Sequence, residues 1–390
     1  MTELSLLWLL LPVAAISGWY VARAGTQRES GIRVNRLSTD YFRGLNYLLN
    51  EQPDKAIEVF LKIAEVDSDT VETHLALGNL FRRRGEVDRA IRFHQNLISR
   101  PTLSPEQRTH ALLELGEDYM RAGLLDRAEA LFSELIEIGA QQPSALRHLM
   151  AIYQQESDWA KAIEAANLLE KATGACHAAE VANFQCEIAE ELISDDRVEE
   201  GLRWVAKALK TDPDCVRASI IEGRQAEAID NIDVAIDAYR RVADQDIDYL
   251  PDVLDPLLRC YRVSGRSSDA RAFLSSMMER YKGISPVLAM ANLISEEEGE
   301  VAAAEFMNTR LRRRPSVRGL EKLIQLNLSG AESGSQSNLV ALADLAHKLL
   351  KGKPIYRCNN CGFGARTAHW QCPSCKQWNT VKPIRGVAGE

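Results

Sequence analysis

Residues 71–104 read VETHLALGNLFRRRGEVDRAIRFHQNLISRPTLS, and the spacing of small residues in this stretch decides the fold. Gly78 stands eight positions into the stretch and Ala90 twenty positions in. The preceding segment has Gly44 and Ala56 at the corresponding places, 34 residues earlier. Small residues at these positions let two helices approach closely, while larger side chains fill the space between them. The stretch therefore predicts two antiparallel helices that recur along the chain.

The pattern continues through most of the chain, with a short insertion at residues 103–107. Equivalent small residues are Gly116, Ala128, Ala162, Gly201, Gly223, Ala235, Ala270 and Ala303. A 34-residue period of this kind is typical of tetratricopeptide repeats, in which each repeat buries its apolar face only against its neighbours. We expect about eight repeats over residues 37–317, forming an all-α superhelical solenoid.

Four cysteines near the C-terminus form two tight pairs, with ten residues between them. The pairs are Cys358-x-x-Cys361 and Cys372-x-x-Cys375. Two such knuckles can place four thiolates around one tetrahedral metal ion, iron or zinc. Two disulfides are the alternative, and they would require an oxidising compartment. The other cysteines are scattered, and we expect them to be buried small apolar residues: Cys176, Cys186, Cys215 and Cys260.

An uncharged run from Leu4 to Ala22 predicts a membrane anchor. As a helix it would span about 28 Å, close to the thickness of the hydrocarbon core. No basic residue precedes the run, which disfavours a cleaved signal peptide. The arginines that follow it are Arg23, Arg28, Arg33 and Arg36. The positive-inside rule then puts the N-terminus outside the membrane and the bulk of the chain in the reducing cytoplasm.

The remaining segments complete the predicted organisation. Residues 1–22 are the anchor, 23–36 a connector, 318–350 terminal helices with a Gly/Ser-rich linker at 328–338, and 351–390 the metal domain. The chain has a formal charge of −8, but residues 351–390 hold seven basic residues and one acidic residue. Because the repeats are acidic and the metal domain is basic, we expect the two to attract each other and dock.

The sequence contains none of the common signatures of catalysis, which predicts a non-enzymatic binding protein. In such a solenoid the first helix of each repeat lines the concave face. Candidate partner-binding residues at these positions are Asn79, Arg82, Arg83, Arg121, Arg147 and Gln154. The arginines could bind carboxylates of an extended partner segment.

The anchor, the repeats and the C-terminal segment YRCNNCGFGARTAHWQCPSCKQW (356–378) together resemble the lipopolysaccharide assembly protein B family of Gram-negative bacteria. The resemblance covers the whole chain, and the C-terminal segment is its specific part. That segment is similar to a rubredoxin-type centre. It differs in having Lys376 where free-standing rubredoxins usually carry glycine, and in a shorter loop between the knuckles. These differences favour a structural metal, zinc or iron, over a redox centre.

The resemblance implies a single-pass inner-membrane adaptor that regulates lipopolysaccharide synthesis. It would promote degradation of the deacetylase that commits precursor to lipid A, by a membrane-bound FtsH-type protease, and would coordinate other lipopolysaccharide assembly proteins. Two other functions stay open. The basic metal domain could bind nucleic acid, with Trp370 and Trp378 as stacking platforms, although the acidic remainder of the chain disfavours this. An iron tetrathiolate could instead transfer electrons.

Overall fold

A computed structural model describes residues 39–47, 49–50, 52–66, 71–328, 333–387 and 389–390. The chain divides into two compact units, Met1–Ser157 with Lys171–Gly174, and Asp158–Glu170 with Ala175–Glu390. The predicted anchor at 1–22 and connector at 23–36 lie outside the described residues. Among the residues that are described, no helix is long and apolar enough to cross a membrane.

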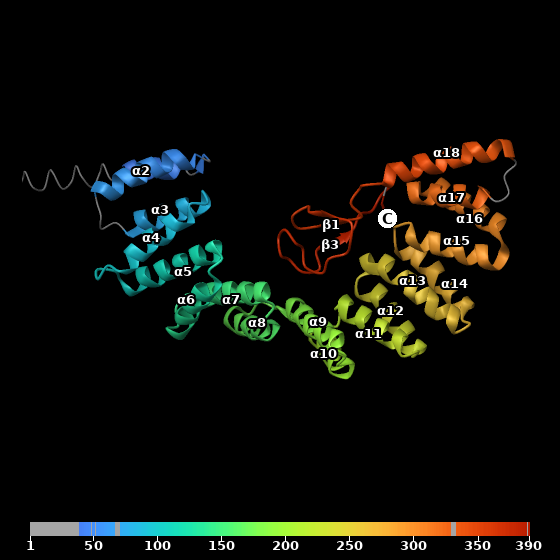
Figure 1. The fold of residues 1–390 in the computed structure, drawn as a ribbon, viewed down its shortest axis with the longest axis horizontal. Helices are drawn as coiled ribbons and strands as arrows, with labels where there is room; N and C mark the ends of the chain where they lie inside the picture. The colour runs from blue at the N-terminus through green and yellow to red at the C-terminus, as the bar shows by residue number, and fades with distance from the viewer. Residues whose placement is uncertain (1–38, 48, 51, 67–70, 329–332, 388) are drawn as a thin grey trace, which may run out of the picture. The chain divides into compact units, whose positions relative to one another are not determined.

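The first unit is a series of paired helices (Figure 1). Its helices are α2 (Pro53–Val66), α3 (Val71–Arg83), α4 (Val87–Ile98), α5 (Pro105–Ala122), α6 (Leu125–Glu137) and α7 (Gln142–Glu156). The predicted insertion at 103–107 forms the start of α5, where Ser104 accepts a hydrogen bond from the Gln107 amide at 3.2 Å. Pro105 follows at the first helical position, and Gly123 ends the helix with φ of 75°. These are standard helix start and stop signals.

The second unit continues the helical pairs and ends in a small sheet. Its helices are α8 (Trp159–Thr173, which crosses the division), α9 (Ala178–Ser194), α10 (Val198–Thr211), α11 (Val216–Ala228), α12 (Ile232–Gln245), the 3₁₀ turn η1 (Ile247–Tyr249), α13 (Leu250–Val263), α14 (Ser267–Arg280), α15 (Ser285–Glu298), α16 (Glu300–Arg313), α17 (Val317–Leu328) and α18 (Ser333–Leu350). Strands β1 (Tyr356–Cys358), β2 (Gly364–Ala365) and β3 (Val381–Pro383) form an antiparallel sheet in the order β2-β1-β3.

The predicted role of the small residues in helix packing is confirmed. An added Cβ at Gly116 would lie 2.5 Å from the Phe132 ring, and one at Gly223 would lie 2.6 Å from Tyr239. His94 takes the same place over Gly78. Each glycine therefore leaves room for the ring of the second helix in its own repeat, and any larger residue would force the pair apart. The fold is a tetratricopeptide-repeat solenoid with a small C-terminal metal domain, as predicted.

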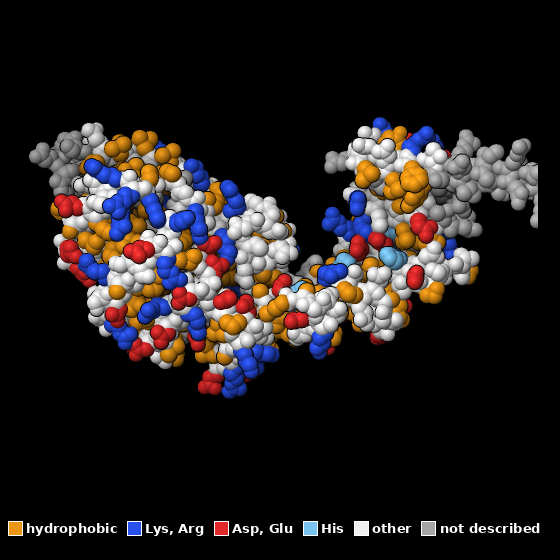
Figure 2. Space-filling view, turned by 180° about the vertical axis from the view of Figure 1, so that it is seen from behind, with side chains coloured by type: hydrophobic (Ala, Val, Ile, Leu, Met, Phe, Trp, Pro, Cys, Tyr) orange, Lys and Arg blue, Asp and Glu red, His pale blue; other side chains and the backbone are white. Residues whose placement is uncertain are grey.

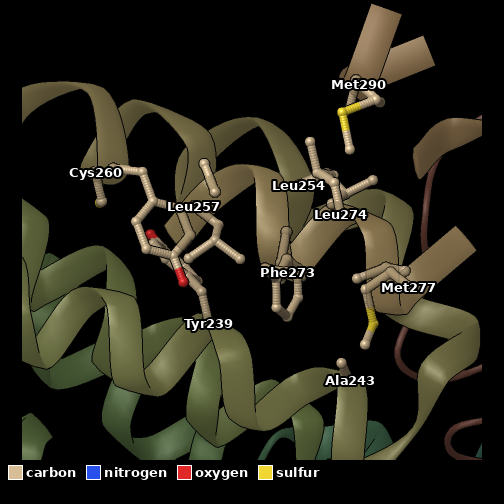
Figure 3. Close-up of a cluster of buried hydrophobic side chains, with 14 of the residues drawn as sticks. Tyr239, Ala243, Leu254, Leu257, Cys260, Phe273, Leu274, Met277 and Met290 are labelled. Atoms are coloured by element: carbon tan, nitrogen blue, oxygen red, sulfur yellow. The ribbon is translucent and has the colours of Figure 1, made fainter. Parts of the chain in front are cut away.

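The core of the second unit is continuous from α11 to α17, as successive helices contribute large side chains to it (Figure 3). Tyr239, Leu257 and Leu274 are fully buried there. Cys260 lies in the same cluster, and Cys186 and Cys215 are also buried, as the sequence predicts. Cys176 is exposed, so the prediction for that cysteine is wrong. It lies in the connection between α8 and α9, where its side chain reaches solvent.

The predicted Gly/Ser-rich linker at 328–338 is shorter than expected. Helix α18 begins at Ser333, five residues before the end of that segment, and Leu339–Leu350 is its later part. Helix propensity is a weak signal that packing can override, and α18 packs along α17. The Gly/Ser composition predicts a spacer, but residues 333–338 belong to the last helical pair.

Candidate metal centre and its contacts with the solenoid

Two similar turns hold the four cysteines. In the first, the Cys358 amide donates to the Phe363 carbonyl at 2.8 Å and the Gly362 amide to the Cys358 carbonyl at 2.9 Å. In the second, Cys372 donates to Gln377 and Lys376 to Cys372, each at 2.9 Å. The residue after each second cysteine has a left-handed backbone, with φ of 80° at Gly362 and 59° at Lys376. The two knuckles therefore share one backbone design.

The four sulfur atoms are close enough to share one metal ion. All four Sγ atoms lie within 4.8 Å of one another. Cys358 and Cys375 are 3.7 Å apart, and Cys361 and Cys372 are 3.6 Å apart. Metal–sulfur bonds of about 2.3 Å in a tetrahedron place sulfurs about 3.8 Å apart, so the residues fit a zinc or iron tetrathiolate. Four thiolates fill the tetrahedron, and the chemistry of such a site is to hold the two knuckles together.

Hydrogen bonds at Cys358 and Cys375 favour the thiolate form that a metal needs. Desolvation opposes the charge on Cys358, but Thr380, whose Oγ1 lies 3.3 Å from the sulfur, and the amides of Asn360 and Cys361 lower the pKa of this thiol to about 6. The Asn360 side chain lowers the pKa of Cys375 in the same way. Such contacts orient the ligands and increase metal affinity.

Lys376 carries a backbone strain that glycine would relieve. A left-handed conformation costs a residue with a Cβ roughly 1 kcal/mol, and glycine adopts it freely. We therefore expect Lys376→Gly to stabilise the metal domain by up to about 1 kcal/mol. The measurement is the chelator concentration at which half of the metal is released.

Gln377→Gly is the matched control for this substitution. Gln377 is the next residue, its side chain is also exposed, and its backbone does not have a positive φ. Glycine there only adds freedom to the unfolded chain, so metal should be released at a lower chelator concentration. Equal shifts in the same direction for both variants would contradict the proposed strain at Lys376.

Within the second unit, the metal domain docks on the helices through the charge attraction that the sequence predicts. Lys382 forms an ion pair with Asp246, and Arg385 with Asp248. Lys382 Nζ also lies 3.8 Å from the centroid of the Tyr249 ring. Burial lowers the pKa of Lys382, although the Asp246 carboxylate partly offsets this effect. Lys382 is thus poorly solvated, and its charge depends on the Asp246 carboxylate.

Hydrogen bonds and the last residues of the chain extend this contact. Tyr356 donates to Asp252 Oδ1 at 2.6 Å. Glu390 is buried, pairs with Arg318 of α17, and accepts from the Ser285 amide at the start of α15 at 3.1 Å. The docked domain therefore contacts both the η1–α13 region and the first turns of α15 and α17.

Both candidate stacking residues take part in the docking. The Trp370 ring lies 5.2 Å from that of Tyr249 and 6.0 Å from the Arg217 guanidinium. Trp378 packs edge-on against Phe184 at 5.8 Å. These tryptophans contact the solenoid of their own chain. Because both rings pack against the solenoid, they are not free to stack on nucleic-acid bases, which disfavours the nucleic-acid alternative.

The comparisons with known proteins match this architecture. Residues 356–383 match a rubredoxin metal binding domain, and residues 73–109 match a tetratricopeptide repeat. Lipopolysaccharide assembly protein B of Escherichia coli (strain K12) is 41% identical over 387 residues, which cover 99% of this chain and 100% of that protein. Its namesake from Haemophilus influenzae is 35% identical, with 98% of each chain covered.

The chain belongs to the lipopolysaccharide assembly protein B family. Similar solved structures include the C-terminal part of a repeat protein from Cytophaga hutchinsonii, with a TM-score of 0.43, 12% identity, and 64% of this chain and 99% of that chain covered. MamA protein has a TM-score of 0.35 at 20% identity, with 45% of this chain and 92% of that chain covered.

The candidate partner-binding residues of this family member fall into two groups, all in the first unit. Arg83, Arg121 and Arg147 are exposed. The other three are partly buried: Asn79, Arg82 and Gln154. Gln154 donates to the Met150 carbonyl of its own helix at 3.1 Å. Only the exposed arginines are therefore placed to meet a partner without rearrangement.

Arg82 forms an internal contact that the repeat pattern does not reveal. Its side chain is 15% exposed and pairs with Glu114 at 2.7 Å and with Asp118 at 2.8 Å, both on α5. Asp118 in turn lies 2.5 Å from Nδ1 of the buried His94. Arg82 therefore joins one repeat to the next. A signal was present in the sequence, because Glu114, Glu117 and Asp118 bring three acids to one helix face.

Proposed function

We propose that this protein is an adaptor, tethered to the inner membrane by residues 4–22, that regulates lipopolysaccharide synthesis. The observation that supports it most is kinship over the whole chain with relatives named for lipopolysaccharide assembly. Its N-terminus would be periplasmic and its repeats cytoplasmic. There it would present the lipid A deacetylase to an FtsH-type protease and contact other lipopolysaccharide assembly proteins. Tethering raises the local concentration of such partners, so weak individual contacts suffice.

The proposed recognition surface is the first-helix face of the first unit. Arg83, Arg121 and Arg147 follow one another on α3, α5 and α7, and all three are exposed. Arg82 contributes indirectly, since its ion pairs hold α3 against α5. Three exposed arginines on successive first helices suit the carboxylates of an extended acidic segment. Because these three positions are basic, they also repel basic proteins from this face.

Reversing these three charges should abolish efficient partner capture. Exposed pairs contribute about 0.2–1 kcal/mol each, so one substitution could be silent. Three reversals replace attraction by repulsion and should weaken capture of the deacetylase at least about tenfold. The measurement is co-purification of the deacetylase and the protease with full-length Arg83→Glu/Arg121→Glu/Arg147→Glu protein.

The matched control reverses three exposed charges on second helices of the same unit, Lys62→Glu/Arg92→Glu/Arg127→Glu. These positions lie outside the proposed surface, so capture should stay close to that of the natural protein. Equal capture by both triple variants, with unchanged helical circular dichroism, would remove the first-helix face from the proposal.

A further inference from the structure

Helix α18 has an apolar stripe that nothing in the described structure covers. Leu342, Leu345 and Leu349 are 52%, 58% and 57% exposed. They are spaced i, i+3 and i+7, so they lie along one side of the helix. The side that packs on α17 is a different one, on which Ala346 is buried. As the last helix of the solenoid, α18 would ordinarily end the stack with a polar outer face.

Basic residues surround the end of this stripe. Lys348 lies in the same turn as Leu345 and Leu349, and Lys351 and Lys353 follow the end of the helix. All three lysines are exposed, and none forms an ion pair with any residue that the structure describes. Asp344 is the one acid described on this helix. Figure 2 shows hydrophobic side chains gathered at the upper edge of this unit, where α18 lies, with basic side chains close to them.

A second basic cluster lies at the end of α16, next to the start of α17. Arg312, Arg313 and Arg314 are consecutive and exposed at the end of α16. The start of α17 joins the two helix ends, since Gly319 lies against Leu311 of α16 and Glu321 lies 3.3 Å from His347 of α18. Six basic residues thus gather near an apolar stripe, in a chain whose formal charge is −8.

We propose that α18 and its flanking basic residues form a second contact with the membrane, on an anionic bilayer surface. Leucines along one side of a helix with lysines beside them are the composition of helices that lie in the interface. Protein interfaces are usually anchored by aromatic side chains, and this helix contains none, which favours a lipid surface over a protein partner. A negatively charged leaflet attracts the basic edge, and lysine stems can extend to the headgroups. The proposal rests on the proposed function only in taking the membrane to be close by.

Hydrogen–deuterium exchange on the full chain tests this contact without any partner protein. The chain is placed in nanodiscs of phosphatidylcholine alone or with added phosphatidylglycerol. We expect peptides from 333–353 to exchange at least about fivefold more slowly in the anionic discs. This factor corresponds to the binding of roughly one lysine to an anionic surface. High salt should remove the difference, since it screens charges beyond a few ångströms.

Two variants and a control make the result specific. Two variants should each lose the lipid-dependent protection of α18: Leu345→Ser/Leu349→Ser and Lys348→Gln/Lys351→Gln/Lys353→Gln. The exchange rate of peptides from α17 should not change, which shows that the fold is intact. Val263→Ser/Val301→Ser is the control, because these valines are 69% and 79% exposed on α13 and α16. It should retain full protection at α18.

Three results would overturn the proposal. Equal exchange of 333–353 in both kinds of disc would show that lipid charge does not matter. Protection that increases with protein concentration in either disc would assign the stripe to a second copy of the chain. Protection that appears only after the deacetylase or the protease is added would assign it to a protein partner. Failure of partner capture, with lipid protection intact, would contradict the adaptor function alone.

Discussion

Replacing Cys358 and Cys372 by serine is expected to unfold residues 351–390 and to leave the helical repeats folded. Each substitution removes one ligand from a different knuckle, so neither pair can complete the tetrahedron. Segments of about 40 residues rarely bury enough apolar surface to fold without a metal. The apolar core around the site is correspondingly small, with Cys358, Cys372 and Val381 as its buried members. Structural zinc sites contribute on the order of 10 kcal/mol, far more than this domain could replace.

Metal content and tryptophan fluorescence measure this loss together. The variant should bind less than stoichiometric metal, and its Trp370 and Trp378 should become exposed to water as the docked contacts with Tyr249 and Phe184 are lost. Far-ultraviolet circular dichroism should change little, because the helices are stabilised by their own neighbours. Cys176→Ser is the control, since Cys176 is exposed and far from the sheet in sequence. Full metal content in the double variant would refute the tetrathiolate site.

The features predicted from sequence are those with short-range signals. The Gly116–Phe132 contact spans 16 residues, and the same spacing recurs in other repeats, so one pattern predicts many contacts. The cysteine knuckles are equally local, since each closes within a few residues. The repeats and the metal ligands could therefore be assigned from the sequence.

The contacts missed from sequence join residues far apart without repetition. Tyr356 bonds to Asp252 across 104 residues, and Lys382 pairs with Asp246 across 136. The difference in charge predicts that the metal domain docks on the repeats, but it does not identify the acidic residues that pair with the basic ones. Arg82 shows a related difficulty. The repeat position of Arg82 predicts the helix face on which it lies. The sequence does not show that Glu114 and Asp118 of α5 bind this side chain within the solenoid.

The docked contact should depend much more on Lys382 than on Arg385. The Lys382 side chain is 12% exposed, so Lys382→Glu places a second carboxylate beside Asp246 in a poorly solvated site. Breaking a fully buried pair costs about 3–5 kcal/mol, and because Asp246 is 34% exposed we expect about 2 kcal/mol here. Arg385 is 44% exposed and pairs with Asp248 close to water, where the contribution is below about 1 kcal/mol. We therefore expect Lys382→Glu to release the metal domain and Arg385→Glu to loosen it only slightly.

Limited proteolysis of the connection at 351–355 and hydrogen exchange of 351–390 measure the release. Both variants should keep one metal per chain, because no cysteine or knuckle residue is changed, and this distinguishes loss of docking from unfolding. Arg366→Glu is the control for hydrogen exchange, since this exposed side chain lies outside the docked surface; its 3.5 Å hydrogen bond to the Gly352 carbonyl lies in the cleaved connection, so proteolysis is not compared for this variant. Asp246→Lys combined with Lys382→Glu reverses the pair and should restore protection. If Lys382→Glu stays docked, or if the reversed pair does not recover, then the aromatic contacts of Trp370 and Trp378 hold the domain and the ion pair does not.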